Sequence, residues 1–368
     1  MTTVTAAVAR ELGAPLSVQQ LELDDLRANE ARVRMVAGGI CHTDAIVRDG
    51  IYPTPLPAVL GHEGAGLVET VGESVTSVRP GDHVVLSAAY CAACNECQAG
   101  RMAYCENLFA QDFGGSRTDG TTAFTTADGT RISSHFFGQS SFSTYSNVVE
   151  SSLVRIDPSV PLEVMAPLGC GMQTGAGSVL NELRPPAGSS IAVSGVGAVG
   201  MAAVMAARVA GCTTIVAIDL HDSRLELAKE LGATHVVNAA AGTVVDELMS
   251  ITGGQGVNYA LDTTAIPGVL AGLIGALSIR GTLALVGAAA PGTTAEFEIG
   301  ASLVKGWTFK TIIQGSSVPQ QFIPRLVELW KQGRFPFDKL VRTYKLDDIN
   351  AGFADSASGA VIKPVVVF

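Results

Sequence analysis

The sequence of 368 residues predicts an α/β protein made of a β-rich part and a doubly wound parallel sheet. Residues 1–172 carry short apolar runs of β type between glycines and prolines, whereas residues 173–313 alternate such runs with helical segments. The tail, residues 314–368, holds one helical segment and a final apolar run that is expected to return to the first part. We therefore expect one domain of residues 1–172 with 314–368 and a second domain of residues 173–313.

The β-rich part is organised around short runs and two long loops. The clearest runs are Ala31–Val36, Gly66–Val71 and His83–Leu86. The loops at 91–105 and 111–135 show little regular pattern, and long loops of this kind are usually functional.

Four cysteines in the first of these loops have the spacing Cys91-x2-Cys94-x2-Cys97-x7-Cys105. Four thiolates so close in sequence can complete a tetrahedron around one zinc ion, which is how a structural zinc site is built. A disulfide knot is the first alternative, but such knots stabilise small domains with thin cores, unlike this long chain. A redox Cys-x-x-Cys pair is the second alternative and would use fewer cysteines. Thiols kept free for metal also fit a reducing cytoplasm.

A second metal-binding set is dispersed and consists of Cys41, the pair His62-Glu63, and Cys170. Two sulfurs and one imidazole make three ligands and leave a fourth position for water or substrate, as in a catalytic zinc site. A lone histidine is usually a buried core residue, but the two cysteines favour the metal interpretation. One closed and one open site predict an enzyme. The remaining cysteine, Cys212, follows an apolar helical stretch and is expected to be a core residue.

The second part shows the alternation that forms βαβ units and a parallel sheet. The expected strands are Ser190–Ser194, Thr214–Asp219 and His235–Val237. The expected helices are Val199–Ala210 and Ser223–Leu231, and the tail adds a helix at Pro319–Lys331 and a β run at Val361–Phe368.

A glycine-rich motif, Gly195-Val-Gly197-Ala-Val-Gly200, joins the first of these strands to the first helix. The first glycine permits a tight turn, the second lets the backbone approach a pyrophosphate, and the third lets the helix pack on the strand. Asp219 ends the next strand, where a carboxylate binds ribose hydroxyls and repels a 2′-phosphate, so NAD is expected rather than NADP. The alternative for Asp219 is a helix N-cap. Arg224 is expected either to touch the same ribose or to be a surface arginine.

Composition excludes several other classes. The net charge of −10 and a pI of about 5.1 disfavour a nucleic-acid partner. Charged residues make up 16% and hydrophobic residues 47%, which is typical of a packed enzyme and not of a disordered chain. The sequence shows neither an apolar window of membrane-spanning length nor a signal peptide, so we expect no membrane association and a cytoplasmic location.

The motifs together resemble the zinc-containing, medium-chain alcohol dehydrogenases over essentially the whole chain. The resemblance is carried by Gly39-Ile-Cys41-His42-Thr43-Asp44, Gly61-His62-Glu63-Gly64, the four-cysteine loop, Gly169-Cys170-Gly171-Met-Gln-Thr-Gly175 and the nucleotide motif. Three further stretches resemble the aryl-alcohol (benzyl alcohol) dehydrogenase branch: Phe136–Phe142, Pro167–Gly177 and Leu261–Thr264. The resemblance implies a GroES-like β domain and a Rossmann domain, with the active site in the cleft between them.

The resemblance also implies roles for individual residues. Cys41, His62 and Cys170 match the catalytic zinc ligands, and the four-cysteine loop matches the structural zinc site. Thr43 matches the hydroxyl that contacts the alcohol and relays its proton, for which a hydroxyl is suited because it both donates and accepts. Asp44 matches a carboxylate that orients the ligand histidine, and Glu63 an acid behind the zinc.

One departure concerns the end of the proton relay. Many relatives carry a histidine at the position of Ile46, so the relay is expected to end through water or His42. His42 also falls where relatives carry a basic residue near the pyrophosphate. Lys363 is expected either to bind a cofactor phosphate or to be a plain surface lysine.

The substrate pocket is expected to be walled by Tyr52, Phe136 and the small residue Ser87, where relatives for small alcohols often carry an aromatic residue. The alternative for Phe136 is a core position. Flat apolar walls suit planar substrates. We therefore predict the NAD-dependent, reversible oxidation of primary aromatic or allylic alcohols to aldehydes, with two Zn²⁺ per chain.

The sequence leaves three alternatives: a glutathione-adduct formaldehyde dehydrogenase, a dehydrogenase of short aliphatic alcohols, and a crystallin-like structural protein. A homodimer or homotetramer is expected, paired through a β edge around Thr282–Val286 and Ala301–Phe309.

Overall fold

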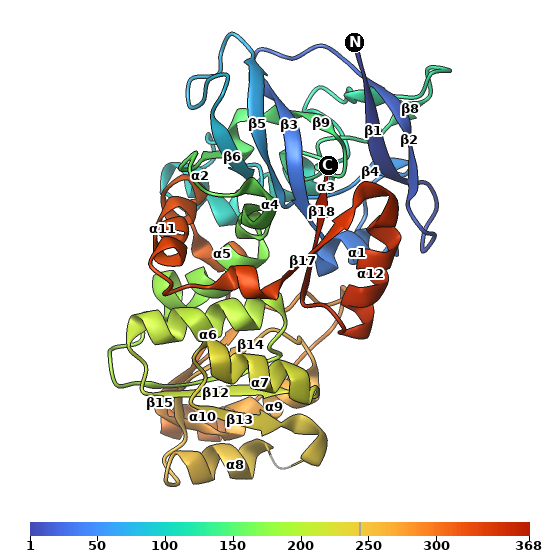
Figure 1. Cartoon of the computed structure of the whole chain (residues 1–368). Coiled ribbons are helices and arrows are strands. Elements are labelled where there is room, and N and C mark those ends of the chain that lie inside the picture. The colour runs from blue at the N-terminus through green and yellow to red at the C-terminus, as the bar shows by residue number, and fades with distance from the viewer. Residues whose placement is uncertain (243) are drawn as a thin grey trace. The chain divides into compact units, whose positions relative to one another are not determined.

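The computed structural model describes residues 1–242 and 244–368, and its elements are labelled in Figure 1. The chain forms two compact units. Unit 1 comprises Met1–Cys170, Val318–Glu328 and Asp338–Phe368, and unit 2 comprises Gly171–Ser317 and Leu329–Phe337. The expected domains differ from these units by a few residues at each boundary and by the segment 329–337, which lies with the second unit.

Unit 1 contains two sheets among its described residues. Sheet A has the strand order β4 (Ala58–Val59), β1 (Thr2–Ala9), β2 (Ser17–Leu23), β7 (Phe124–Thr125), β8 (Arg131–Ile132). Sheet B has the order β10 (Leu153–Arg155), β6 (His83–Leu86), β5 (Gly64–Val71), β3 (Glu30–Gly39), β18 (Lys363–Val367), β17 (Val341–Lys345), and β9 (Tyr145–Val149) also pairs with β3.

The chain end completes sheet B. Strand β18 pairs antiparallel with β3, with Val366 opposite Gly38, and the two strands lie side by side in Figure 1. The expected return of the tail is therefore confirmed, and it brings the residues of β18 next to the end of β3 that leads to Cys41.

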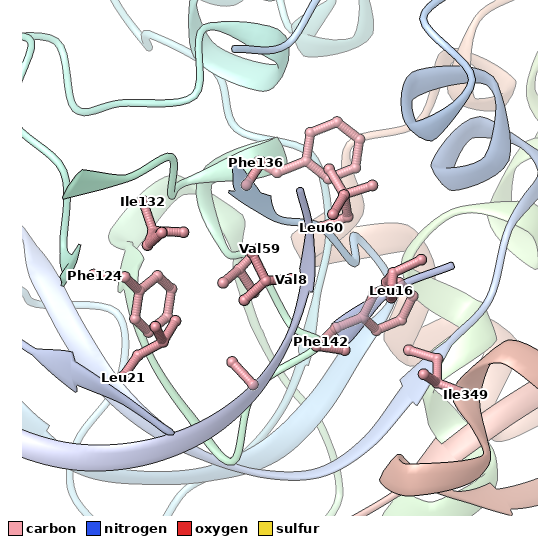
Figure 2. Close-up of a cluster of buried hydrophobic side chains, with 14 of the residues drawn as sticks. Val8, Leu16, Leu21, Val59, Leu60, Phe124, Ile132, Phe136, Phe142 and Ile349 are labelled. Atoms are coloured by element: carbon pink, nitrogen blue, oxygen red, sulfur yellow. The ribbon is translucent and has the colours of Figure 1, made fainter. Parts of the chain in front are cut away.

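A large hydrophobic core of unit 1 lies against sheet A and consists of buried aliphatic and phenyl side chains (Figure 2). It takes the inward-facing residues of β1 and β2, such as Val8 and Leu21, and phenyl rings from outside the sheet, such as Phe136 and Phe142. Alternating burial along a strand is what places one face of a sheet in a core, and each large apolar side chain buried this way contributes about 1.5–3 kcal/mol.

Unit 2 contains sheet C, whose strands are all parallel. Its order is β13 (His235–Asn238), β12 (Thr214–Asp219), β11 (Ser190–Ser194), β14 (Val257–Asp262), β15 (Leu277–Leu285), β16 (Thr308–Thr311). The order reverses on either side of β11, as in the doubly wound nucleotide-binding fold. The predicted α/β class and the predicted strands of this sheet are confirmed.

The helices connect these strands. In unit 1 they are α1 (His42–Arg48), α2 (Asn95–Gln98), α3 (Leu108–Phe113), α4 (Leu162–Met165) and α12 (Ile349–Ser358). In unit 2 they are α5 (Gly171–Gly177), α6 (Ala198–Ala210), α7 (Asp222–Leu231), α8 (Val244–Ile251), α9 (Pro267–Gly275) and α10 (Ile299–Lys305), and α11 (Pro319–Lys331) runs from one unit into the other. A π-helix, η5, spans Ser178–Leu183, and the 3-10 helices used below are η2 (Phe136–Gly138) and η4 (Ala166–Gly169). Among the described residues, every helix is too short or too polar to cross a bilayer.

The expected pairing edge is partly wrong. Thr282 lies in β15, which is an inner strand between β14 and β16, and most of 301–309 forms helix α10 and the start of β16. The sheet edge is β16 itself, whose four side chains are all exposed. Strand order is set by long-range packing, which the local pattern does not encode.

Candidate metal centres and nucleotide site

His62 lies in the turn before β5 and has one ring nitrogen fixed and the other free for a ligand. Its Nδ1 lies 3.0 Å from Oδ1 of Asp44. Asp44 is itself fully buried and accepts hydrogen bonds from the backbone N–H groups of Gly61 and Cys41. The Nε2 atom of His62 is buried and has no hydrogen-bond partner among the described residues. A carboxylate on Nδ1 fixes the tautomer in which Nε2 is a lone-pair donor, as metal-binding histidines require.

Three further ligand groups surround this nitrogen. Ligand atoms of Cys41, His62, Glu63 and Cys170 all lie within 4.8 Å of one another. Cys41 directly precedes α1, and Cys170 follows η4. Two sulfurs, an imidazole and an adjacent carboxylate form the donor set that zinc prefers, so these residues fit a zinc ion.

Charge distribution in this cluster favours a cation. A hydrogen bond from the Cys170 thiol, supported by His62, lowers the pKa of Cys41 well below its usual range. Burial alone would lower the pKa of His62, but the charges of Asp44 and Cys41 outweigh burial and raise it well above its usual value. A metal ion that binds the His62 ring must displace the proton that its raised pKa retains. Metal loading here is therefore coupled to proton release.

Glu63 is held by an ion pair that spans the chain. The Lys363 ammonium group donates to both carboxylate oxygens of Glu63, at 3.0 and 2.9 Å, and to the carbonyl of Ile40 at 3.1 Å. Burial raises the pKa of Glu63, and the ammonium group opposes that effect. A Cβ atom at Gly39 would lie 2.1 Å from the Glu63 carboxylate, so this approach requires glycine.

The expected phosphate role of Lys363 is therefore wrong. The side chain is buried, and its three N–H donors are all used within unit 1. An ammonium group has no fourth donor to offer a cofactor. The alternative of a surface lysine is wrong for the same reason.

The residues of the expected proton relay lie on α1. Thr43 is half-buried and His42 is exposed. Ile46 is buried, so no relay passes through that position. The expectation that His42 or water ends the relay stays a prediction.

The four-cysteine loop forms a closed set of sulfurs. Ligand atoms of Cys91, Cys94, Cys97 and Cys105 lie within 4.8 Å of one another. Backbone N–H groups point at the sulfurs, from Cys91 to Cys105, from Cys94 to Cys91 and from Cys97 to Cys94, at 3.4 to 3.5 Å. Such bonds stabilise thiolates, and the set fits a structural zinc ion.

An aromatic cluster packs on His62. The ring of Phe137 stacks on the imidazole with centroids 4.6 Å apart, and Phe136 meets it edge-on at 5.6 Å. Phe113 contacts both phenyl rings, and Tyr52 meets Phe113 at 5.7 Å. Tyr52 is half-buried.

Two expected pocket residues are placed differently. Ser87 is fully buried, and its hydroxyl donates to the carbonyl of Gly169, next to Cys170. Phe136 is 1% exposed and belongs to the core of unit 1 (Figure 2). Neither side chain presents a surface to a ligand, because hydrogen bonding and ring packing turn them inward. Their expected role as pocket walls is therefore wrong.

The nucleotide motif in unit 2 has the backbone that a dinucleotide needs. Gly195 has φ = +78°, and a Cβ there would lie 2.5 Å from Thr263. A Cβ at Gly200 would lie 2.1 Å from the carbonyl of Gly195, so glycine allows α6 to approach β11. Gly197 caps α6 and has open space where its Cβ would lie. That space at a helix N-terminus fits a pyrophosphate.

Asp219 is hydrogen-bonded to the glycine-rich motif through Val196. Its carboxylate accepts from the backbone N–H groups of Val196, Leu220 and His221. Arg224 lies 3.6 Å from the same carboxylate. The N-cap alternative is wrong, because His221 caps α7 and the N–H groups that Asp219 accepts from all lie before that helix. A carboxylate has further lone pairs for a ribose hydroxyl.

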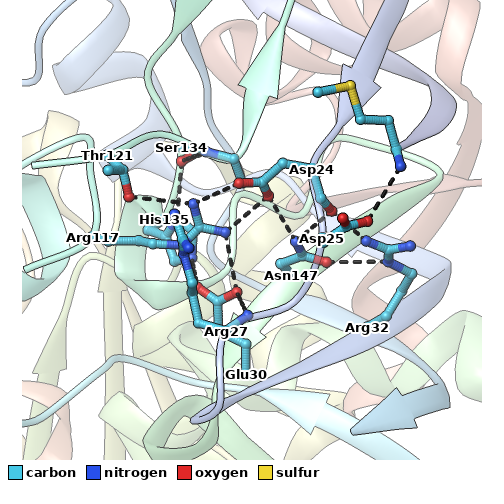
Figure 3. A network of polar contacts seen from close by, with 12 residues as sticks. Asp24, Asp25, Arg27, Glu30, Arg32, Arg117, Thr121, Ser134, His135 and Asn147 are labelled. Carbon is cyan, nitrogen blue, oxygen red and sulfur yellow. Dashed lines mark hydrogen bonds and ion pairs between the residues drawn. The ribbon is translucent and has the colours of Figure 1, made fainter. Parts of the chain in front are cut away.

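Sequence reasoning missed a second buried polar network, which surrounds Glu30 at the start of β3 (Figure 3). Glu30 accepts from Arg117 at 2.6 and 3.1 Å, and Nε2 of His135 lies 2.8 Å from Glu30 Oε1. Arg117 also donates to both carboxylate oxygens of Asp24. Arg117, in a glycine-rich stretch of the 111–135 loop, was the sequence signal for this network.

Gln139 was also given no role from the sequence. It is buried in the stretch Phe136–Phe142, where a polar amide among apolar residues signals buried hydrogen bonds.

A doubly wound nucleotide-binding unit, joined in one chain to a β unit that carries an open and a closed cysteine-rich metal site, defines a zinc-dependent dehydrogenase. The chain belongs to the zinc-containing, medium-chain alcohol dehydrogenase family. Family models match residues 27–158, as an alcohol dehydrogenase GroES-like domain, and residues 198–332, as a zinc-binding dehydrogenase.

Full-length relatives agree with this assignment. A geraniol dehydrogenase of Castellaniella defragrans is 41% identical over 99% of this chain and 97% of its own length. The solved structure of a benzyl alcohol dehydrogenase from Acinetobacter calcoaceticus is 45% identical, with a TM-score of 0.97 over all of both chains. An alcohol dehydrogenase zinc-binding domain protein from Burkholderia ambifaria is 53% identical, with a TM-score of 0.98 over 100% of this chain and 99% of the other.

Proposed function

We propose that the protein oxidises primary aromatic or allylic alcohols reversibly to aldehydes, with NAD as hydride acceptor. The observation that carries this proposal is the full-length similarity to relatives named for geraniol, an allylic alcohol, and for benzyl alcohol. The aromatic side chains packed around His62 support it, together with the half-buried Tyr52, which packs against Phe113 of that cluster.

The proposed roles follow from the contacts. Cys41, His62 and Cys170 would hold a catalytic Zn²⁺, which supplies a Lewis acid that lowers the pKa of an alcohol. Asp44 fixes the His62 ring, and Thr43 would relay the hydroxyl proton of the substrate, accepting it while donating its own proton toward water or His42. The four-cysteine loop would hold a second, structural Zn²⁺.

The proposed preference for NAD over NADP rests on the Asp219 carboxylate. Its carboxylate lies next to the glycine-rich turn through the bond from Val196, where a negative charge repels a 2′-phosphate. Gly195, Gly197 and Gly200 would accommodate the pyrophosphate, with Arg224 close to the ribose.

The alternatives have less support. A glutathione-adduct dehydrogenase needs a cation for the adduct's carboxylates, and Arg117 in the 111–135 loop is committed to Glu30 and Asp24. A crystallin-like protein would not need the catalytic ligand set, which is intact. The kinetic comparison below distinguishes the proposed enzyme from a dehydrogenase of aliphatic alcohols.

Self-association is proposed through unit 2. Strand β16 is an exposed sheet edge, and helix α10, which precedes it in the chain, exposes Ile299, Leu303 and Val304 at 75–82%. An unpaired edge flanked by apolar side chains favours a symmetric partner, so we propose a homodimer or homotetramer. The cytoplasmic location stays a prediction.

Steady-state kinetics test the substrate class. The zinc-loaded protein with NAD is expected to show kcat/KM for benzyl alcohol, cinnamyl alcohol and geraniol more than about tenfold above that for ethanol, which takes only ~1.4 kcal/mol of differential transition-state binding. Equal values for ethanol and benzyl alcohol would contradict the aromatic or allylic substrate class. Absence of NAD-linked activity with every alcohol would contradict the enzyme proposal.

A further inference from the structure

The segment from His135 to Ser140 has a backbone that residues with a Cβ atom seldom adopt. The φ angle is +60° at His135, +52° at Phe137 and +52° at Ser140, and Gly138 between them is at +69°. Left-handed backbone is unfavourable for side-chain-bearing residues, so it persists only where the surroundings hold it firmly. Such strained segments are concentrated at functional sites.

Gln139, in the middle of this segment, binds the backbone around the candidate metal ligand. The buried side chain donates from Nε2 to the carbonyls of His62 and Ser87, at 3.0 and 3.1 Å. Its Oε1 accepts from the N–H of Gly64 at 3.0 Å. An amide is the side-chain group that supplies two donors and an acceptor together. One side chain therefore fixes the backbone on both sides of Glu63 and ties it to the residue after β6.

Ser140 adds a second connection to the same loop. Its hydroxyl donates to the carbonyl of Val59 at 2.6 Å and accepts from the N–H of Phe136 at 3.0 Å. The N–H of Ser141 then donates to the carbonyl of Gly61 at 2.9 Å. The C-terminal end of the strained segment, with the following Ser141, is thus bound to residues 59–64.

The same segment supplies the rings that confine the His62 imidazole. Phe137 stacks on one face with an interplanar angle of 28°, and Phe136 meets the ring at 86°. Asp44 fixes Nδ1, while the direction of Nε2 also depends on where the main chain of His62 lies. We propose that Gln139 is a positioning residue that sets the direction of His62 Nε2 for metal coordination. This inference rests on the proposed role of His62 as a zinc ligand.

The variant Gln139→Met tests the proposal, because it keeps the side-chain length and removes both donors and the acceptor. Asn350→Leu is the matched control: Asn350 also bonds backbone through its amide, with Leu16, and lies on α12 of unit 1. Each protein is loaded with Co²⁺ for visible absorption spectra, and the zinc form is mixed with a chromogenic chelator to time metal release.

Wild type and Asn350→Leu are expected to share one cobalt spectrum and one release profile. Gln139→Met is expected to shift the cobalt bands and to release the catalytic ion about 10- to 100-fold faster, with release from the four-cysteine site unchanged. An unchanged spectrum and release rate would overturn the proposal.

Ser140→Gly decides the matter if Gln139→Met does not fold. Glycine tolerates φ = +52° while the bonds to Val59 and Phe136 are lost, so folding should survive. A several-fold faster release supports the positioning role of the segment, and wild-type behaviour overturns it. Failure of the proposed function looks different, because wild type itself would then hold no ion at His62.

Discussion

Lys363 and Glu63 form a buried ion pair, 2.9 to 3.0 Å between the ammonium nitrogen and the two carboxylate oxygens, across 300 residues of sequence. The pair exists because β18 returns to pair with β3 in sheet B. The Glu63 charge outweighs burial and raises the pKa of Lys363, so the lysine remains charged inside the protein. The ammonium group balances the charge of a carboxylate with an oxygen within 4.8 Å of the sulfur atoms of Cys41 and Cys170.

Lys363→Met is expected to destabilise the protein, because it leaves the buried Glu63 charge without a partner. Loss of one member of a buried pair costs about 3–5 kcal/mol, measured as the free energy of unfolding in urea at constant zinc. The double variant Lys363→Met/Glu63→Gln should recover a large part of this loss, because no buried charge remains. The KM for NAD should stay within about twofold of wild type. A tenfold higher KM with unchanged stability would restore the phosphate role that the structure argues against.

The sequence predicted best what local pattern controls. Strands β6, β11 and β12 and helix α11 have the predicted bounds, because each combines a clear hydrophobic period with flanking turn residues. The pairing edge was placed partly on β15 because the order of the strands in sheet C depends on packing between distant segments, which the local pattern does not encode.

For the site, the ligand types and spacings indicated which residues belong together, and the structure brings each ligand set within 4.8 Å. The sequence did not indicate the supporting contacts. Lys363 and Gln139 bond to residues far away in the chain, and the buried Ser87 hydroxyl bonds to the carbonyl of Gly169. These contacts arise only after the strands have paired.

Metal analysis of cysteine variants separates the two proposed zinc sites. Wild type is expected to hold two zinc ions per chain. Cys170→Ala should hold one and lose activity while keeping its fold, whereas Cys94→Ala should mainly lose stability, since structural zinc contributes folding free energy. Cys212→Ala is the control, because Cys212 is a buried free cysteine away from both ligand sets, and it should keep both ions and the activity. One zinc per chain in the wild-type protein would show that the two-site proposal is wrong.

Substitution of Asp219 tests the choice of cofactor. Asp219→Gly or Ser should weaken NAD and relatively improve NADP, because the negative charge beside the 2′ position is lost. These variants also lose the acceptor for Val196, Leu220 and His221, so both cofactors should bind somewhat less well in absolute terms.

Asp219→Asn removes the charge and keeps an acceptor oxygen, so the change in the NAD/NADP ratio of kcat/KM should remain. The control Asp222→Asn, an exposed carboxylate on α7, should leave the ratio unchanged. A wild-type preference for NADP would exclude the role proposed for Asp219.

Acid titration tests the buried network of Figure 3. Burial raises the pKa of Glu30, but hydrogen bonds from His135 and Arg117 outweigh burial and lower it to about 2 from 4.5. Because the folded-state pKa is depressed, Glu30 stabilises the protein fully above about pH 4.5 and loses this effect as the pH falls toward 2. The stability difference between wild type and Glu30→Gln, from urea unfolding at equal zinc, should therefore be about 2 kcal/mol smaller at pH 3 than at pH 6. Zinc loss in acid affects both proteins alike, since their cysteines are the same.

Glu69→Gln, which breaks the exposed pair with Arg34, should cost less than about 1 kcal/mol at either pH. A Glu30→Gln difference that stays constant between these pH values would mean that the carboxylate is not held in its charged form by the network.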